Sequence, residues 1–300
     1  MLLLFKMYEK IKEEMICPYC GHNPEHLTSE NALEEGTLLQ KGRYQLGTVL
    51  GSGGFGITYA AWDYALCQPV AIKEYFPKSF ISRNILENNC VTIIKEHQAA
   101  YEIGLRRFNR EARILSSLQN IKSVVAVHDW FEANGTAYIV MEYVRGKNLE
   151  QYVKENQIAP AELIAMLKDL IDSLAAIHAQ GVLHRDISPS NLMVQEDGTV
   201  KLIDFGNATT EERLAEGKDR TVIFNRAFAP IEQYDENSLQ GPWTDVYAFN
   251  SCESLLCVTI EEGNQSIGEY AFSNCPSLRT SSLPVHSKYP PMHSLNLPVP

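Results

Sequence analysis

The sequence predicts an α+β fold with two lobes, in which a β-rich lobe carrying one helix precedes a helical lobe. Short strand-like runs broken by glycines or polar turns open the globular part, at 44–50, 57–63 and 70–75. Apolar residues then recur at helical spacing over 105–118. A long amphipathic helix is expected over 160–180, with Gly181 in the position of a terminating glycine.

Two β-hairpins are expected from their turn sequences. Asn134-Gly135 separates the strand-like runs 124–132 and 136–143. Asp197-Gly198 separates the shorter runs 191–194 and 200–203. Asn-Gly and Asp-Gly pairs favour the two-residue turns that connect antiparallel strands, so each pair of runs is predicted to form one hairpin.

Length and composition restrict the class of protein. The chain has 300 residues, of which 45% are hydrophobic and 21% are charged, so it is not a disordered chain. The net charge of -11 provides no overall field for binding a nucleic-acid backbone or an anionic membrane. We also expect no membrane span, because no apolar run is long enough. The 7 cysteines are odd in number and scattered, which favours a reducing, cytoplasmic setting.

The chain divides into four segments by composition. Residues 1–40 are an N-terminal segment that contains a Cys-x-x-Cys pair, and residues 41–249 alternate strand and helix signals densely enough to bury one large core. Residues 250–283 are a separate segment with a short internal repeat. Residues 284–300 are rich in Pro and Ser and are predicted to be a disordered tail.

The first candidate site is the glycine run Gly51, Gly53 and Gly56, a G-x-G-x-x-G pattern. Alone it is a weak signal, since ordinary turns and dinucleotide-binding folds share it. A dinucleotide-binding glycine run opens a helix, whereas here residues 57–62 continue as a strand. The context therefore favours a glycine hairpin that covers phosphates with its backbone N–H groups.

Lys73 ends the strand that follows, in Val-Ala-Ile-Lys. A lysine at a strand end is ordinarily solvated. However, Glu111 lies on the next predicted helix, and an ion pair between the two would hold Lys73 for the α- and β-phosphates of a nucleotide.

The segment His184-Arg185-Asp186-Ile187-Ser188-Pro189-Ser190-Asn191 is more specific. Asp186 is the candidate to orient or deprotonate a hydroxyl, and Asn191 is a candidate metal ligand. Asp204, in Asp-Phe-Gly, follows the second hairpin and supplies a second candidate ligand. Each residue alone could be a cap or a turn, but the set occurs in order and in the required secondary-structure context.

Together these motifs resemble the eukaryotic-type protein kinase superfamily, over Arg43 to about Phe249, and are most similar to bacterial serine/threonine kinases. The resemblance implies a two-lobed kinase fold and transfer of the γ-phosphoryl group of ATP, with Mg²⁺, to Ser or Thr of a protein substrate. It implies catalytic roles for Asp186, Lys73 and Glu111, and Mg²⁺ binding by Asn191 and Asp204.

The resemblance also implies further positions. Ala71 would contact adenine, Met141 would be the gatekeeper, and Glu142 to Val144 would be the hinge that meets adenine through its backbone. Glu232 ends a segment that resembles the A-P-E motif, and Asp245 resembles the aspartate that braces the catalytic loop.

Four departures leave a rival hypothesis open, that of a catalytically weak or inactive nucleotide-binding remnant. Thr58 stands where the family usually has Val, and Ser188 where it usually has Lys. Lys73 and Glu111 are 38 positions apart, which implies an insertion around 75–100. The kinase pattern stops just after Asp245, so the helical lobe is expected to be truncated.

After that point, Tyr247–Leu255 and Tyr270–Leu278 match as Y-A-F-x-x-C-x-S-L with a period of 23. This pattern resembles BspA-like leucine-rich repeats. Two partial repeats do not bury a solenoid core, since about three are needed. An interaction module that uses this segment is therefore a third functional hypothesis.

Cys17 and Cys20 form half of a possible zinc site. A closed tetrahedral site needs four ligands, and no second Cys-x-x-Cys occurs in the sequence. His22 and His26 are further candidates, and ordinary thiols are the alternative. The sequence does not predict the oligomeric state.

Overall fold

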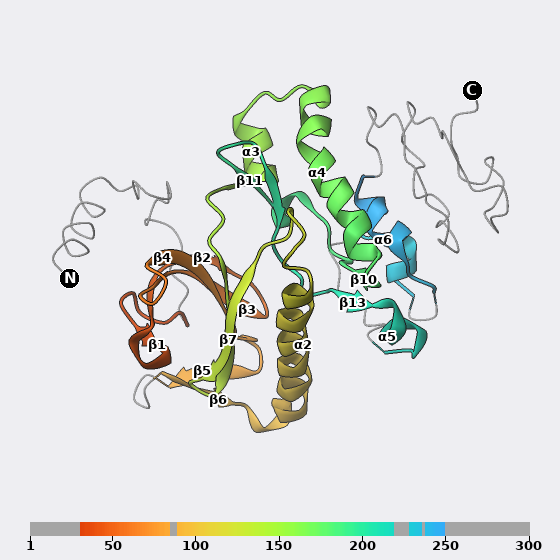
Figure 1. Ribbon diagram of the computed structural model, residues 1–300. Coiled ribbons are helices and arrows are strands. Elements are labelled where there is room, and N and C mark those ends of the chain that lie inside the picture. The colour runs from red at the N-terminus through yellow and green to blue at the C-terminus, as the bar shows by residue number, and fades with distance from the viewer. Residues whose placement is uncertain (1–30, 85–88, 219–227, 236–237, 250–300) are drawn as a thin grey trace, which may run out of the picture. The chain divides into compact units, whose positions relative to one another are not determined.

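The computed structural model describes residues 31–84, 89–218, 228–235 and 238–249 (Figure 1). The chain divides into two compact units. The first comprises Met1–Gln119 and Val125–Gly146, and the second comprises Asn120–Val124 and Lys147–Pro300. The segment 1–30, with Cys17 and Cys20, and the segment 250–300, with the repeat and the tail, lie outside the described residues.

The first unit contains eight strands and one helix among its described residues: β1 (Leu38–Leu39), β2 (Tyr44–Ser52), β3 (Gly56–Asp63), β4 (Gln68–Tyr75), β5 (Ile81–Asn84), β6 (Cys90–Ile93), α2 (Gln98–Ser117), β7 (Val127–Ala133) and β8 (Thr136–Glu142). Six of the strands form one antiparallel sheet in the order β1-β2-β3-β4-β8-β7, and α2 packs against β7 and β8 (Figure 1). The predicted β-rich lobe with one helix is thus confirmed.

The core of this unit follows from strand alternation. Along β3, every second side chain from Ile57 to Asp63 is buried, and the others are partly exposed. In β8, Thr136 to Val140 are all buried, because this strand lies inside the sheet and α2 packs against it. The predicted hairpin turn is confirmed, since Asn134 and Gly135 both have positive φ, 54° and 74°.

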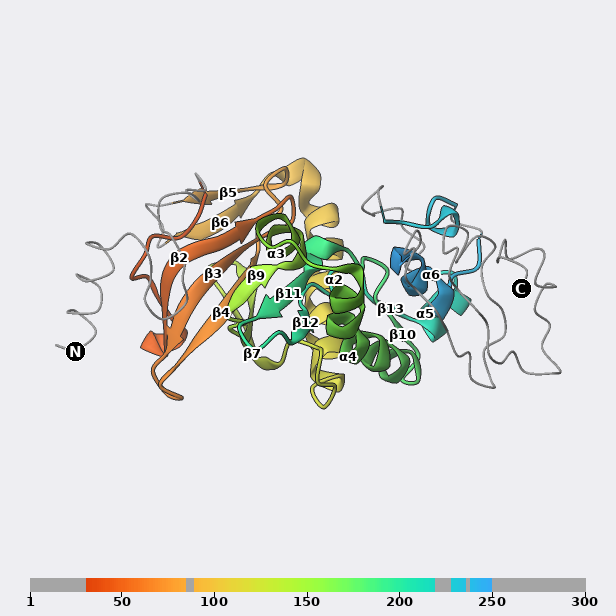
Figure 2. The same ribbon diagram turned by 90° about the horizontal axis from the view of Figure 1, so that it is seen from above.

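The helix α2 begins seven residues before the predicted helix, at Gln98. In its first two turns the only large apolar residues are Tyr101 and Ile103, beside two alanines and a glycine, and these do not form a clear helical stripe. These turns are nevertheless fixed to the unit, because Tyr101 in this part is buried. The insertion expected around 75–100 is an antiparallel hairpin of β5 and β6, followed by a 3₁₀ helix at Lys95–His97 that leads into α2 (Figure 2).

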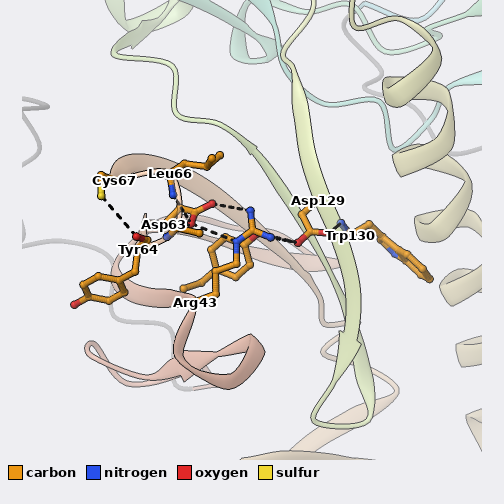
Figure 3. A network of polar contacts seen from close by, with 9 residues as sticks. Arg43, Asp63, Tyr64, Leu66, Cys67, Asp129 and Trp130 are labelled. Atoms are coloured by element: carbon orange, nitrogen blue, oxygen red, sulfur yellow. Dashed lines mark hydrogen bonds and ion pairs between the residues drawn. The ribbon is translucent and has the colours of Figure 1, made fainter.

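A network of polar contacts is centred on Arg43, the residue just before β2 (Figure 3). It connects the start of β2 to β3 and β7. The Arg43 guanidinium pairs with Asp63 at 3.0 Å and with Asp129 at 3.1 Å. Asp63 also accepts from the backbone N–H groups of Ala65 and Leu66. Burial alone would raise the pKa of Asp63, but these hydrogen bonds and the charge of Arg43 hold it below its usual value. The carboxylate therefore stays ionised inside the fold.

The second unit holds the remaining strands and α-helices of the described residues: β9 (Gly146–Asn148), α3 (Leu149–Glu155), α4 (Pro160–His178), β10 (Val182–Leu183), β11 (Leu192–Gln195), β12 (Val200–Leu202), β13 (Thr209–Thr210), α5 (Glu211–Ala215) and α6 (Pro242–Val246). Its strands form a three-stranded sheet in the order β12-β11-β9 and the antiparallel pair β10-β13. The helix α4 buries Leu170, Leu174 and Ile177, as its amphipathic pattern predicts. Gly181 follows its end with φ 68°, and the turn at Asp197-Gly198 connects β11 to β12.

In the described part of the chain, no helix combines the length and the apolar character that crossing a membrane requires.

Candidate functional site

The candidate residues fall into two sets, one in each unit. The first unit carries the residues expected to bind nucleotide, which are Gly51, Gly53, Gly56, Ala71, Lys73, Glu111, Met141, Glu142 and Val144. The second unit carries Asp186, Asn191 and Asp204. No group of three or more His, Cys, Asp and Glu side chains that could hold a metal occurs among the described residues.

The glycine run forms the hairpin between β2 and β3, as predicted. The Gly53 N–H donates to the Gly56 carbonyl at 2.9 Å, which closes the loop. A Cβ built at Gly56 would lie 2.7 Å from the Glu74 carbonyl oxygen, so this position requires glycine because β4 is close. No described atom lies within 4 Å of a Cβ built at Gly51 or Gly53. The loop backbone is therefore accessible to an anion of phosphate size.

Lys73 and Glu111 are brought together. Lys73 lies in β4 and Glu111 in α2, and Lys73 Nζ lies 2.7 Å from Glu111 Oε1. The Glu111 side chain is only 4% exposed, and that of Lys73 is 18% exposed. A buried carboxylate needs a partner charge, so the pair holds the lysine ammonium in one place.

The proposed adenine-contacting residues lie on neighbouring strands. Ala71 in β4 is the register partner of Met141 in β8. Glu142 ends β8, and its N–H donates to the Ala126 carbonyl at 2.8 Å. Val144 follows two residues later, where the chain has left the strand. The backbone from Glu142 to Val144 thus passes from a strand into an irregular segment, which suits recognition through main-chain groups.

In the second unit, Asp186 lies in the loop between β10 and β11. Its backbone N–H donates to His184 Nδ1 at 3.2 Å, and the Asn207 amide donates to Asp186 Oδ2 at 3.2 Å. The neighbouring Ser188 is 2% exposed, and its Oγ lies 2.9 Å from Ser190 Oγ. A buried hydroxyl thus stands where the family usually has a lysine, and it contacts the loop itself.

Asn191 and Asp204 offer oxygen atoms of the kind that Mg²⁺ prefers. The Asn191 amide nitrogen donates to the Asp186 carbonyl at 2.8 Å, which leaves its amide oxygen as the group that suits a cation. Asp204 is exposed, and its Oδ1 accepts from the Gly206 N–H at 3.0 Å. The donor set therefore fits a magnesium ion.

Asp245 braces the loop that carries Asp186. It is 1% exposed and accepts hydrogen bonds from the backbone N–H of His184 at 2.9 Å and of Arg185 at 2.6 Å. A third contact joins it to His178 Nε2 at 2.7 Å. Burial alone would raise the pKa of Asp245, but the hydrogen bonds and charges of His178 and His184 hold it below its usual value. An ionised carboxylate therefore fixes the backbone just before Asp186.

His184 is fully buried, and its ring meets Phe205 edge-on at a centroid distance of 4.6 Å. Burial lowers the pKa of His184 below its usual value, although the charges of Asp245 and Asp204 act in the opposite direction. The unfolded chain therefore binds a proton at His184 more readily than the folded chain. Protonation of His184 therefore does not affect the free energy of unfolding at a pH above the pKa that this histidine has in the unfolded chain. As the pH falls below that pKa, the free energy of unfolding decreases.

We predict that the protein loses thermal stability between about pH 7.5 and about pH 5.5, and that His184→Asn loses less over the same range. The asparagine Oδ1 can replace Nδ1 as acceptor from Asp186 but does not titrate. Melting curves of both proteins at matched ionic strength measure the two losses of stability. The difference between the two losses reports on His184, because the other histidines are the same in both proteins. Equal losses in the two proteins would show that His184 does not carry this proton linkage.

Three structural contacts of the site were not predicted from the sequence. His178 contacts Asp245, Asn207 contacts the Asp186 carboxylate, and Gln233 Nε2 donates to the Arg185 carbonyl at 2.8 Å. His178 ends α4, two residues before the end of the predicted helix and six residues before His184, and this spacing is the only sequence signal for it. Near the A-P-E-like segment, Glu232 accepts from the Thr244 hydroxyl at 3.0 Å, and burial raises its pKa.

Comparisons with known proteins agree with this geometry. A family model described as "Protein kinase domain" matches residues 44–257, and a "BspA type Leucine rich repeat region" matches residues 221–294. Serine/threonine-protein kinase PrkC of Bacillus subtilis is 34% identical over 208 residues, which cover 69% of this chain and 29% of PrkC. Serine/threonine-protein kinase PknL of Mycobacterium tuberculosis is 29% identical over 215 residues, which cover 71% of this chain and 48% of PknL.

A similar solved structure, PpkA-294 in its apo form, superposes with a TM-score of 0.63 at 32% identity. The match covers 74% of this chain and 77% of that chain. The chain spans between about a quarter and about a half of the length of the curated relatives it matches.

Proposed function

Because this chain belongs to the protein kinase family, we propose that it transfers the γ-phosphoryl group of ATP to serine or threonine hydroxyls of protein substrates. The observation that carries the proposal is the 2.7 Å ion pair between Lys73 and the buried Glu111. Several of the similar proteins are named serine/threonine-protein kinases, which supports serine and threonine as the residues that are phosphorylated.

The first unit would bind ATP. The backbone N–H groups around Gly51, Gly53 and Gly56 would hold the phosphates, since a side chain at these positions would occupy that space or meet β4. Lys73 would contact the α- and β-phosphates from the position that Glu111 fixes. Ala71 and Met141 would contact the adenine ring, and the backbone from Glu142 to Val144 would recognise its edge.

The second unit would carry the groups that act on the hydroxyl. Asp186 would orient the substrate hydroxyl and accept its proton as the phosphoryl group is transferred. Asn191 and Asp204 would hold Mg²⁺, which neutralises charge on the phosphate oxygens. Asp245 would keep Asp186 in place through the two backbone N–H groups that it binds. Because phosphoryl transfer depends mainly on positioning and electrostatics, these contacts are a central part of the proposed mechanism.

We predict that millimolar Mg-ATP raises the melting temperature of the protein and that Lys73→Met abolishes most of this rise. A ligand at about 100 times its Kd stabilises the folded state by about 2.7 kcal/mol, which is a readily measured shift. Each variant is compared with its own nucleotide-free sample, because removing Lys73 breaks the ion pair with the buried Glu111 and can change the stability by itself. Lys78→Met, at an exposed lysine of the same unit, is the matched control. A full shift in Lys73→Met would contradict the proposed nucleotide site.

Two smaller proposals rest on the sequence. The odd number of scattered cysteines supports a cytoplasmic location. The Cys17–Cys20 pair supports a zinc site that draws its other ligands from elsewhere. Metal analysis of the purified protein, compared with Cys17→Ser, tests the second proposal, and a metal-free wild-type protein with reduced thiols would contradict it.

A further inference from the structure

Three consecutive residues of β4 contact three different parts of the chain that follows. Lys73 pairs with Glu111 in the second half of α2. Glu74 pairs with Arg83 in β5 at 2.7 Å. The Tyr75 hydroxyl donates to the Tyr101 carbonyl in the first half of α2 at 3.3 Å. One short stretch of strand thus holds both the inserted hairpin and the helix that carries Glu111.

Glu74 is a fully buried carboxylate with three donors. Besides Arg83, the hydroxyl groups of Tyr59 and Tyr138 each donate to it at 2.8 Å. Burial, followed by the charge of Glu74, raises the pKa of both tyrosines above the usual value, so they remain protonated donors. Tyr59 also accepts from the Leu33 N–H at 3.0 Å, which joins the segment before β1 to the same cluster. Glu74 therefore accepts hydrogen bonds from side chains on β3, β5 and β8.

Arg83 uses its whole guanidinium to close the hairpin. Apart from the pair with Glu74, its Nε donates to the Asn31 carbonyl at 2.8 Å and its Nη1 to the Asn89 carbonyl at 3.0 Å. The guanidinium carbon lies 4.7 Å from the centre of the Phe76 ring. The side chain is only 4% exposed. Such a planar, multiply bonded guanidinium fixes orientation as well as position, which a lysine at the same place would not do.

The hairpin is joined to α2 through the 3₁₀ helix at Lys95–His97 (Figure 2). The Ile94 N–H donates to the Phe80 carbonyl at 2.9 Å, and the Phe80 ring stacks on His97 at 5.0 Å. His97 is the residue immediately before α2. A displacement of the hairpin would therefore move the start of the helix.

The first half of α2 has little freedom to adjust. A Cβ built at Gly104 would lie 2.0 Å from the Tyr75 hydroxyl, so the helix packs against the Tyr75 side chain more closely than a residue other than glycine would allow in this arrangement. The Tyr101 hydroxyl donates to the Gly135 carbonyl in the turn between β7 and β8 at 2.8 Å. The start of α2 is thus held at several points, and Glu111 lies about two turns beyond Gly104 on the same helix.

We infer that Glu74 and Arg83 are positioning residues for the Lys73–Glu111 pair. Their ion pair fixes the β5–β6 hairpin, the hairpin fixes the start of α2, and α2 presents Glu111 to Lys73. The inference rests on the proposed function only in that the Lys73–Glu111 pair serves nucleotide binding. The alternative is that the Glu74–Arg83 pair stabilises the unit as a whole and has no particular effect on α2.

Hydrogen–deuterium exchange over 98–117 distinguishes the two. We expect Arg83→Leu to raise exchange in this segment about tenfold or more over wild type, since the helix would open locally. Arg83→Lys, which keeps the charge but not the contacts to Asn31 and Asn89, should give an intermediate increase. The matched control is Arg43→Leu, which breaks the ion pairs with Asp63 and Asp129; the side-chain contacts described for Arg43 are to these two residues and to Tyr44, and none is to α2 (Figure 3). It should lower the melting temperature and leave exchange over 98–117 within about twofold of wild type.

A second readout links the effect to the Lys73–Glu111 pair. Arg83→Lys should raise the Kd for Mg-ATP severalfold, but in a Glu111→Gln background it should have little further effect. Two residues that act through one contact are non-additive, whereas independent structural effects multiply. If Arg83→Leu does not fold, the exchange over 98–117 and the Kd for Mg-ATP are measured on Arg83→Lys and Glu74→Gln instead.

Unchanged exchange over 98–117 in the Arg83 variants, or an equal increase in Arg43→Leu, would overturn the inference. The inference would also be overturned if Arg83→Lys raised the Kd for Mg-ATP by the same factor in the Glu111→Gln background as in wild type. The exchange measurement needs neither nucleotide nor phosphotransfer. A failure of the proposed function, seen as wild-type protein that does not bind Mg-ATP, is therefore distinguishable from a failure of the positioning role.

Discussion

Replacing Asp186 with asparagine is expected to lower phosphotransfer by about 100-fold to 10,000-fold, which is the range that a positioned general base contributes. Asparagine keeps the size of the side chain and can still accept a hydrogen bond from Asn207, which lies 3.2 Å from Asp186 Oδ2. It cannot accept the proton of the substrate hydroxyl. Initial rates with a generic Ser/Thr protein substrate, at saturating Mg-ATP, measure the effect.

The control for this substitution is Asp197→Asn. Asp197 lies in the turn between β11 and β12 of the same unit, is exposed, and accepts hydrogen bonds from the N–H and the hydroxyl of Thr199. We expect wild-type turnover from Asp197→Asn and a wild-type Mg-ATP thermal shift from Asp186→Asn. Equal turnover in wild type and Asp186→Asn would show that Asp186 is not the base.

Replacing Asp245 with alanine is expected to have the second largest effect, on stability and turnover together. The substitution leaves the N–H groups of His184 and Arg185 without an acceptor in the protein interior and removes the partner of His178. Each orphaned buried donor costs about 1–3 kcal/mol, so a loss of about 3 kcal/mol or more is expected. Turnover should fall as well, because the loop before Asp186 loses its brace. Chemical denaturation and initial rates measure the two effects.

The milder variant His178→Gln provides the control for Asp245→Ala, since its amide can still donate to Asp245. It should lose clearly less stability than Asp245→Ala. If Asp245→Ala keeps wild-type stability and turnover, the backbone contacts of Asp245 do not position the loop.

Acid unfolding provides an independent check of the Asp245 carboxylate. Its pKa in the folded chain lies below the usual value for an aspartate, so its contribution to stability is complete above that usual value and is lost as the pH falls further. Wild type should therefore lose more stability than Asp245→Ala below about pH 4.

The parts of the fold that the sequence predicted are those with a strong local signal. The glycine hairpin, the Asn134-Gly135 turn and the amphipathic helix α4 each follow from periodicity or turn chemistry. The two-lobed kinase fold followed from the order of the motifs, and the similarity to PpkA-294 confirms it.

The missed elements are short or depend on contacts that are distant in sequence. The helix α3 has seven residues and is marked mainly by its capping residue, Asn148, which accepts from the Gln151 N–H. The strands β5 and β6 have four residues each, which is too short for periodicity to identify them, although Val91, Thr92 and Ile93 in β6 have high β-propensity. The Glu74–Arg83 pair is decided by packing, because nothing in either residue's local sequence indicates that it is buried.

The candidate site shows the same division. The motifs of phosphoryl transfer identify five residues of the candidate site, which are Asp186, Asn191, Asp204, Lys73 and Glu111. The roles given to these residues remain predictions, as do the boundaries of the four segments. His178 and Asn207 were missed because a single polar side chain near a motif has many ordinary explanations, and only the folded chain shows what it contacts.

Transfer of labelled γ-phosphate from ATP to a protein substrate is the most direct measurement of the proposed kinase activity. With Mg²⁺ present, we expect label on serine or threonine of the substrate from the wild-type chain, and none above background from Asp186→Asn. The contradicting result would be a folded wild-type chain that binds Mg-ATP in a Lys73-dependent manner and yet transfers no label. That outcome would identify the chain as a nucleotide-binding remnant instead of an enzyme.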